Sequence, residues 1–130
     1  MITLQLSELL RHDSTIATLE LSGNQIGTLG CKALAAAIRD NRTLKTLNVD
    51  RCSLGEDGAK IIADAISDNE GIKELNIEDN DIGEEGGDAI MEMVKDNSVI
   101  ERIKFEKDNF VSEKTTRTIN EILESGSYVP

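Results

Sequence analysis

The chain repeats itself every 28 residues along most of its length. The stretches LELSGNQIGTLG, LNVDRCSLGEDG and LNIEDNDIGEEG begin at Leu19, Leu47 and Leu75 and share their apolar positions and two glycines. Ile103 continues the series, and the apolar pattern runs through four consecutive units without an insertion or a deletion. Such tandem self-similarity predicts a solenoid, in which each small unit stacks on its neighbours. Within a single domain, 1–130, the expected repeats are 14–41, 42–69 and 70–97, followed by a capping repeat, 98–130.

Each unit has two halves with different periodicities. The half LKTLNVDR alternates apolar and polar residues, as a short strand with one buried face does. The half GEDGAKIIADAISDN places its apolar residues on one face of a helix, and the acidic pair Glu56-Asp57 falls in the first turn, where the helix dipole favours negative charge. Gly27, Gly55 and Gly83 are expected to turn the chain from strand to helix. Because one unit cannot bury its own core, the strands should form a parallel sheet and the helices an outer layer.

Both ends of the chain depart from the repeat. The segment 1–13, which contains SELLRHD, matches only the helix of a preceding unit, so we expect an N-terminal helical cap or half repeat. Phe105, Phe110 and Tyr128 all lie in the last unit. We therefore expect large side chains to close the hydrophobic core at that end.

The unit LxxLxLxxN/CxL followed by a long helix, as in TLKTLNVDRCSLGEDGAKIIADAI, resembles the ribonuclease-inhibitor-like class of leucine-rich repeats. The resemblance spans about residues 14–125. It implies an α/β leucine-rich repeat solenoid, a short right-handed horseshoe with parallel strands on its concave face and helices on its convex face. Proteins with similar units include the ribonuclease inhibitor, cytosolic innate-immune receptors, Ran GTPase activators and tropomodulins. What these proteins share is a rigid curved surface that binds another macromolecule, usually a protein, and the resemblance implies such a surface here.

Charge and composition narrow the partners that this surface could bind. The chain has 14 Lys and Arg residues against 25 Asp and Glu residues, which gives a formal net charge of −11. Because phosphate binding needs clustered cations, nucleic acid is not an expected partner, and a protein with a basic surface is favoured. No apolar run is long enough to span a membrane, and the first residues do not resemble a signal peptide. Two cysteines do not make a disulfide framework, so we expect a cytoplasmic location.

Side chains between the buried strand positions should point to the concave face, in three rows across four strands. The first row is Thr18, Thr46, Glu74 and Arg102, the second is Glu20, Asn48, Asn76 and Lys104, and the third is Ser22, Asp50, Glu78 and Glu106. The third row places like charges on adjacent strands, which a basic partner would relieve, although Arg51 and Lys107 lie near enough in sequence to neutralise them. With one arginine and no aromatic residue on this face, we expect a salt-sensitive contact of moderate affinity. The candidate partner-binding residues are Glu20, Asn48, Asp50, Glu74, Asn76, Glu78, Arg102, Lys104 and Glu106.

No pattern of catalytic residues emerges, so we expect a non-catalytic protein without cofactor or metal. His12 is the only histidine, and the glycines of GEEGGDAI are explained by the repeat rather than by a phosphate-binding loop. Two alternatives remain open besides a protein-binding module. The chain could regulate an enzyme or a filament, like a GTPase activator or a tropomodulin that caps actin, or it could be a C-terminal fragment of a larger leucine-rich repeat receptor. The edge strand around Leu19–Leu21 has unpaired backbone groups that would also permit self-association.

The two cysteines occupy repeat positions rather than a recognisable thiol site. Cys52 stands where the neighbouring units have Asn24 and Asn80, directly after the strand, and the resemblance implies that this class accepts Asn or Cys there. Cys31 falls at a tight position on the helix. We expect both to be buried, free thiols that serve packing rather than chemistry.

Overall fold

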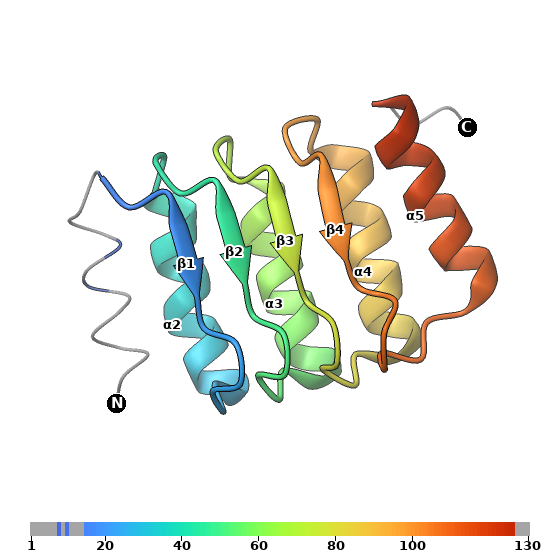
Figure 1. Ribbon diagram of the computed structural model, residues 1–130, viewed down its shortest axis with the longest axis horizontal. Helices are drawn as coiled ribbons and strands as arrows, with labels where there is room; N and C mark the ends of the chain where they lie inside the picture. Colours follow the sequence, from blue (N-terminus) through green and yellow to red (C-terminus); the bar gives the residue numbers. More distant parts are fainter. Residues whose placement is uncertain (1–7, 9, 11–14, 127–130) are drawn as a thin grey trace.

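Strands and helices alternate along the chain in the computed structural model, which describes residues 8, 10 and 15–126. The order is β1 (Thr18–Glu20), α2 (Gly27–Asp40), β2 (Thr46–Asn48), α3 (Gly55–Ser67), β3 (Glu74–Asn76), α4 (Gly83–Asp96), β4 (Arg102–Lys104) and α5 (Glu113–Ser125). The strands form one parallel sheet in the order β1-β2-β3-β4. Figure 1 shows them side by side, with α2, α3 and α4 stacked behind and α5 at the far end. The predicted α/β solenoid is confirmed, while its division into a cap and repeats at the stated boundaries stays a prediction.

The strands pair in the register that the repeat predicts. Leu19 lies opposite Leu47, Leu47 opposite Leu75, and Leu75 opposite Ile103. The leucines of this row are buried against the helices, and Ile103 at the last strand is partly buried. Since the offset between neighbouring units is constant here, each apolar residue meets its own counterpart, and one continuous core runs the length of the sheet.

A ladder of buried asparagines joins the units where each helix returns to the next strand. Its members are Asn41, Asn69 and Asn97. Asn69 Nδ2 donates to the carbonyl oxygens of Ile38 at 2.8 Å and Asn41 at 2.9 Å. Its Oδ1 accepts from the backbone N–H groups of Gly71 at 2.7 Å and Ile72 at 2.8 Å. The side chain thus satisfies backbone groups in two successive helix-to-strand turns, which the helices and strands leave unpaired.

A second ladder lies at the opposite end of the strands, where the chain turns into the helices. Asn80 Oδ1 accepts from the backbone N–H groups of Cys52 at 2.9 Å and Leu54 at 3.2 Å. Its Nδ2 donates to the carbonyl oxygens of Val49 at 2.9 Å and Ile77 at 3.0 Å. Each turn is therefore held by a side chain of the following unit, which keeps neighbouring units at a fixed spacing.

Glycines shape the entry into the helices. Gly27, Gly55 and Gly83 have φ values of +67°, +66° and +68°, which confirms their predicted role in the turn, because side chains disfavour this backbone region. Gly86 permits a close approach in the first turn of α4. A Cβ atom there would lie 2.7 Å from Ile82 Cβ, so any larger residue would force the turn apart.

Cys52 fills a place in the second ladder, as predicted. It is fully buried, and its thiol donates to the carbonyl oxygen of Leu21 at an Sγ–O distance of 3.0 Å. Asn24 makes the same kind of contact, from Nδ2 to the carbonyl oxygen of Leu21, at 2.9 Å. Cys31 is also free and fully buried. Both thiols therefore contribute to packing, and neither is exposed for chemistry.

Both thiols should react slowly with a thiol reagent while the chain is folded. Burial raises the pKa of Cys52, and it raises the pKa of Cys31 from 9.0 to about 11. Since the reactive form is the thiolate, we expect modification of Cys31 at pH 8 to be about 100-fold slower than in the unfolded chain, and modification of Cys52 to be slower as well. The raised pKa of Cys31 also stabilises the fold fully below pH 9 and progressively less from pH 9 to 11. Colorimetric thiol titration tests the first expectation, and melting temperatures at pH 8 and 10.5 test the second, with Cys31→Ala as the control that should lose less stability.

The fourth unit contains one residue more than the others, which corrects the expectation of a repeat without insertions. The N–H of Cys52 donates to Asn80, 28 residues later, but the N–H of Asn80 donates to Asn109 Oδ1, 29 residues later, at 2.7 Å. Asn109 Nδ2 donates to the carbonyl oxygens of Ile77 at 2.8 Å and Phe105 at 2.9 Å, so Asn109 continues the ladder. The extra residue lies between Phe105 and Asn109.

This insertion decides which side chains close the core. Phe105 is fully buried, as predicted, but Phe110 is 73% exposed, so the expectation that it helps to close the core is wrong. Val111 packs there instead, against α4, where a Cβ atom added to Gly87 would lie 2.6 Å from Val111 Cγ1. The third aromatic, Tyr128, lies outside the described residues.

Most of the N-terminal segment 1–13 lies outside the described residues, and so does His12. Glu8 and Leu10 have helical conformation, Leu10 is buried, and its carbonyl oxygen accepts from Asn41 Nδ2 at 3.0 Å. Among residues 8, 10 and 15–126, no helix has the length and apolar character needed to cross a membrane.

Candidate functional site

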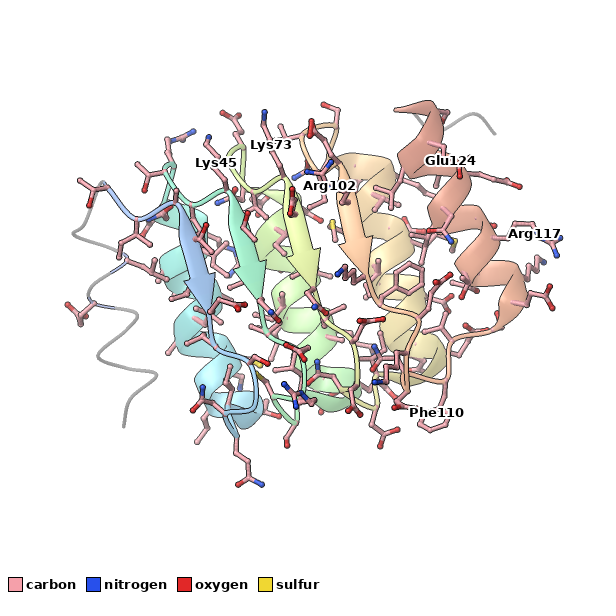
Figure 2. The ribbon with its side chains drawn as sticks, viewed as in Figure 1. Lys45, Lys73, Arg102, Phe110, Arg117 and Glu124 are labelled. Carbon is pink, nitrogen blue, oxygen red and sulfur yellow. The ribbon has the colours of Figure 1, made fainter. Side chains whose placement is uncertain are left out.

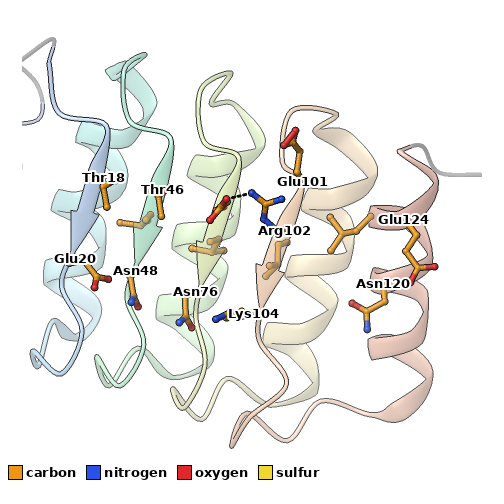
Figure 3. Close-up of a pocket in the computed structure, with 15 residues that line it drawn as sticks. Thr18, Glu20, Thr46, Asn48, Asn76, Glu101, Arg102, Lys104, Asn120 and Glu124 are labelled. Atoms are coloured by element: carbon orange, nitrogen blue, oxygen red, sulfur yellow. Dashed lines mark hydrogen bonds and ion pairs between the residues drawn. The ribbon is translucent and has the colours of Figure 1, made fainter.

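A groove of about 760 Å³ lies on the concave face, the exposed side of the sheet. The strands form its floor, and α5 forms a wall beside β4 (Figure 3). Its polar and charged lining residues are Thr18, Glu20, Thr46, Asn48, Glu74, Asn76, Glu101, Arg102, Lys104, Asn120 and Glu124. Leu47, Leu75, Ile103 and Leu123 also line it, and of these Ile103 and Leu123 are only partly buried. The groove therefore combines polar and charged side chains of the strands with exposed apolar surface beside α5.

The first predicted row lies in this groove in the expected register. Thr18 is opposite Thr46, Thr46 opposite Glu74, and Glu74 opposite Arg102. Glu74 Oε1 accepts from Arg102 Nη2, which forms an ion pair across β3 and β4 and raises the pKa of the Arg102 guanidinium (Figure 3). Both side chains are well exposed, so the pair adds little stability and remains open to exchange partners.

The second row also lies in the groove. Glu20 is opposite Asn48, Asn48 opposite Asn76, and Asn76 opposite Lys104. Asn48 Oδ1 accepts from the backbone N–H of Asp50 at 3.0 Å, and Asn76 Oδ1 accepts from that of Glu78 at 3.1 Å. These backbone contacts fix both carboxamide groups. Asn76 lies next to Lys104, and Asn48 lies between Glu20 and Asn76.

The third row lies beyond the strand ends and outside the groove lining. Asp50 Oδ2 accepts from Arg51 Nε at 3.1 Å, and Arg51 Nη2 also donates to Ser22 Oγ at 3.0 Å. A hydrogen bond with Ser22, together with Arg51, lowers the pKa of the Asp50 carboxyl group. Glu106 accepts from Asn120 Nδ2 at 3.2 Å. Of this row, Asp50 is neutralised and Glu106 is hydrogen-bonded, so its negative potential is weaker than the sequence alone suggests.

The six candidates Glu20, Asn48, Glu74, Asn76, Arg102 and Lys104 are therefore brought together in one groove, while Asp50, Glu78 and Glu106 lie outside its lining. The residues that sequence reasoning missed are Glu101 and three α5 residues, Asn120, Leu123 and Glu124. A signal for them was present, because β4 is the last strand of the repeat pattern and pairs only with β3 among the described residues. The outer edge of β4 is thus free of a neighbouring strand, and α5 lies beside it (Figure 1).

A second hollow of about 660 Å³ lies where the strands turn into the helices. Asp79, Asp81 and Asp108 line it together with Arg51 and the exposed Phe110. Figure 2 shows Phe110 at the turn between β4 and α5. Within the described part of the chain, no group of three or more His, Cys, Asp or Glu side chains is arranged to hold a metal ion.

The repeat matches a family model described as Leucine Rich repeat at residues 12–35, 40–63 and 68–91, which together make up more than half of the chain. The chain belongs to the leucine-rich repeat family. Its helical outer layer fits the ribonuclease-inhibitor-like class of leucine-rich repeats, as predicted. No curated protein sequence matches the chain.

Solved structures similar to this leucine-rich repeat chain include a leiomodin domain and a tropomodulin domain. A structure titled "Leiomodin-1 Actin-Binding Site 2 (ABS2)" matches with a TM-score of 0.88 at 19% sequence identity, over 96% of this chain and 72% of that chain. The tropomodulin C-terminal domain of Caenorhabditis elegans matches with a TM-score of 0.62 at 12% identity, over 97% of this chain and 93% of that chain. At these identities the similarity establishes a shared leucine-rich repeat fold.

Proposed function

We propose that the chain is a non-catalytic protein-binding module and that the groove on the concave face receives its partner. The observation that carries this proposal is the groove itself, a hollow of about 760 Å³ lined by polar side chains of four strands and one helix. Hydrogen-bonded strands and two buried asparagine ladders hold these side chains at fixed spacing. A preorganised surface loses less entropy on binding, which favours recognition of a macromolecule.

The chemistry of the surface favours a partner with a basic segment. The net charge is −11, and the carboxylates Glu20, Glu101 and Glu124 line the groove without an ion pair among the described residues. Glu78 extends the acidic surface beyond the strand ends. Because the lining contains no aromatic residue and one arginine, the expected contact has moderate affinity and weakens as salt rises. Two free, buried thiols support a reducing compartment such as the cytoplasm.

Reversing the charge of the groove carboxylates Glu20, Glu101 and Glu124 to lysine should weaken capture of a partner from native extract by about tenfold, because three favourable charge contacts become repulsive. The matched control is Asp40→Lys, Asp88→Lys and Glu121→Lys, which changes the net charge equally at exposed helix positions. Quantitative pull-down at low and high salt measures both variants. Equal losses in the two variants, or no loss in the first, would exclude this face from binding.

Actin is a second candidate partner, favoured by the match over 96% of this chain with the leiomodin-1 domain whose title names an actin-binding site. Actin elongation measured with and without the purified chain tests this candidate, and an unchanged rate together with no co-sedimentation would exclude it. The remaining alternatives, a GTPase activator and self-association through the outer edge of β1, stay predictions.

A further inference from the structure

The most specific feature of the groove is a line of hydrogen-bond donors on its floor. It consists of Asn48, Asn76 and Lys104, which lie at the same level on three adjacent strands. We call these residues the donor row. Adjacent strands of a sheet are about 4.8 Å apart, so neighbouring members can contact one ligand group.

The orientation of the two carboxamides follows from their backbone contacts. A carboxamide accepts hydrogen bonds only through its oxygen. The contacts with the N–H groups of Asp50 and Glu78 therefore direct Oδ1 of Asn48 and Asn76 toward the backbone. The NH₂ groups of Asn48 and Asn76 therefore remain for a ligand, and neither has a hydrogen-bond partner among the described residues. Both side chains are half-buried, so a ligand that left them unpaired would incur a desolvation cost.

Lys104 supplies the positive charge of the donor row. It has no ion-pair partner among the described residues, whereas Arg102 on the same strand is engaged by Glu74. Figure 3 shows the Lys104 side chain extending toward Asn76. An ammonium group beside an outward NH₂ group matches the two oxygens of a carboxylate, which accepts hydrogen bonds and carries the opposite charge.

The groove also offers a place for the apolar stem of an acidic side chain. Leu123 on α5 and Ile103 on β4 are partly buried and line the groove beside the donor row. Asp50, Glu78 and Glu106 each follow a member of the donor row by two residues, just beyond the strand ends, which corresponds to about 7 Å along the chain. On each of these three strands an acidic residue therefore follows a donor.

From this arrangement we propose that the donor row binds the side-chain carboxylate of an Asp or Glu residue in the partner polypeptide. The acidic residues beyond the strand ends then contact basic residues of the same segment. The bound segment has mixed charge, and its acidic residue fixes its register and direction on the sheet. This inference rests on the proposed function of the groove and adds the chemistry of the ligand.

Replacement of Asn76 by aspartate tests the proposal sharply. An aspartate has nearly the same shape, and its carboxylate can still accept the N–H of Glu78, but it turns the donor into an acceptor that repels a ligand carboxylate. Gln25→Glu is the matched control, because it makes the same charge change at an exposed turn outside the groove lining. Lys104→Gln provides a second, independent variant, which removes charge and leaves the backbone contacts intact.

The probe is a phage-displayed library of random decapeptides whose C-termini are fused, so that only side-chain carboxylates are available. The chain should enrich peptides that combine one acidic residue with basic residues. Binding of the best synthetic peptide, with its C-terminus amidated, should fall about tenfold for Asn76→Asp and for Lys104→Gln, and stay unchanged for Gln25→Glu. Melting temperatures establish that each variant is folded.

The outcomes distinguish failure of the donor-row assignment from failure of the groove as a binding site. Enriched peptides that are basic but contain no acidic residue, or peptides whose binding is insensitive to both donor-row variants, would overturn the donor-row assignment and leave the groove as a binding site. A library from which the chain enriches no peptide at all would overturn both. Loss of acidic residues from the peptides selected by Asn76→Asp, with basic residues retained, is the result that we expect.

Discussion

Replacing Asn69 by alanine should lower the free energy of unfolding by about 4 kcal/mol, because four buried backbone groups lose their partner together. Asn69 is 3% exposed, and its carboxamide makes four hydrogen bonds of 2.7 to 2.9 Å to two successive helix-to-strand turns. An unsatisfied buried polar group costs about 1–3 kcal/mol, and partial entry of water offsets some of this. A loss of this size is a large part of the about 5–15 kcal/mol that stabilises a typical domain.

Urea unfolding followed by circular dichroism measures this loss, and Asn24→Ala is the matched control. Asn24 is exposed, and its side chain makes one hydrogen bond, to the carbonyl oxygen of Leu21. The same substitution there should cost about 1 kcal/mol or less. If Asn69→Ala were equally mild, the asparagine ladder could not be what fixes the spacing between units, and the rigidity of the groove floor would need another source.

The apolar periodicity was sufficient to predict the sheet and the two inner rows of the concave face. Leu47 and Leu75 must be buried, and in a parallel sheet with a constant offset their flanking residues necessarily meet their counterparts. The positions of Asn76 beside Lys104 and of Glu74 beside Arg102 follow from that alone. The buried role of Cys52 followed in the same way, from its place in the repeat.

The hydrogen bonds that give these residues their functional character could not be predicted from periodicity. Nothing in the repeat says that Asn76 turns its oxygen toward the backbone, or that Arg51 neutralises Asp50 rather than a partner. Both depend on local backbone geometry beyond the strand ends, where Arg51 has a positive φ of 51°. Contacts from α5 were missed for a different reason, since the three predicted rows were built from the strand pattern alone and included no helix residue.

The one-residue insertion was hidden by a coincidence of hydrophobicity. Phe110 lies 28 residues after the buried Ile82, so an alignment without insertions places it in the core. The ladder contact between Asn80 and Asn109 shows that the spacing is 29 residues. Phe110 therefore falls in the exposed turn, where it has a φ of +59°. Asparagine identity was the better guide to register here, because a ladder side chain has specific partners whereas any apolar residue can mimic a core position.

The two phenylalanines should respond to substitution in opposite ways. Phe105 is fully buried, so Phe105→Ala removes a large side chain from the core and should lower the free energy of unfolding by about 4 kcal/mol. Phe110→Asn removes an exposed ring from a left-handed backbone conformation that asparagine tolerates well. We expect it to leave stability unchanged or to raise it by about 0.5–1 kcal/mol. Urea unfolding of both variants, with Val111→Ala as a third, gives the comparison.

This comparison distinguishes the two alignments of the last unit. With a spacing of 28 residues, Phe110 would be the counterpart of Ile82, and its replacement by a polar residue would cost several kcal/mol. With a spacing of 29 residues, Val111 takes that place against Gly87, and Val111→Ala should cost about 1–2 kcal/mol while Phe110→Asn costs nothing. A severe loss for Phe110→Asn would contradict the insertion. The position of α5 follows from the same turn, so the experiment also bears on the wall that closes the groove beside Lys104.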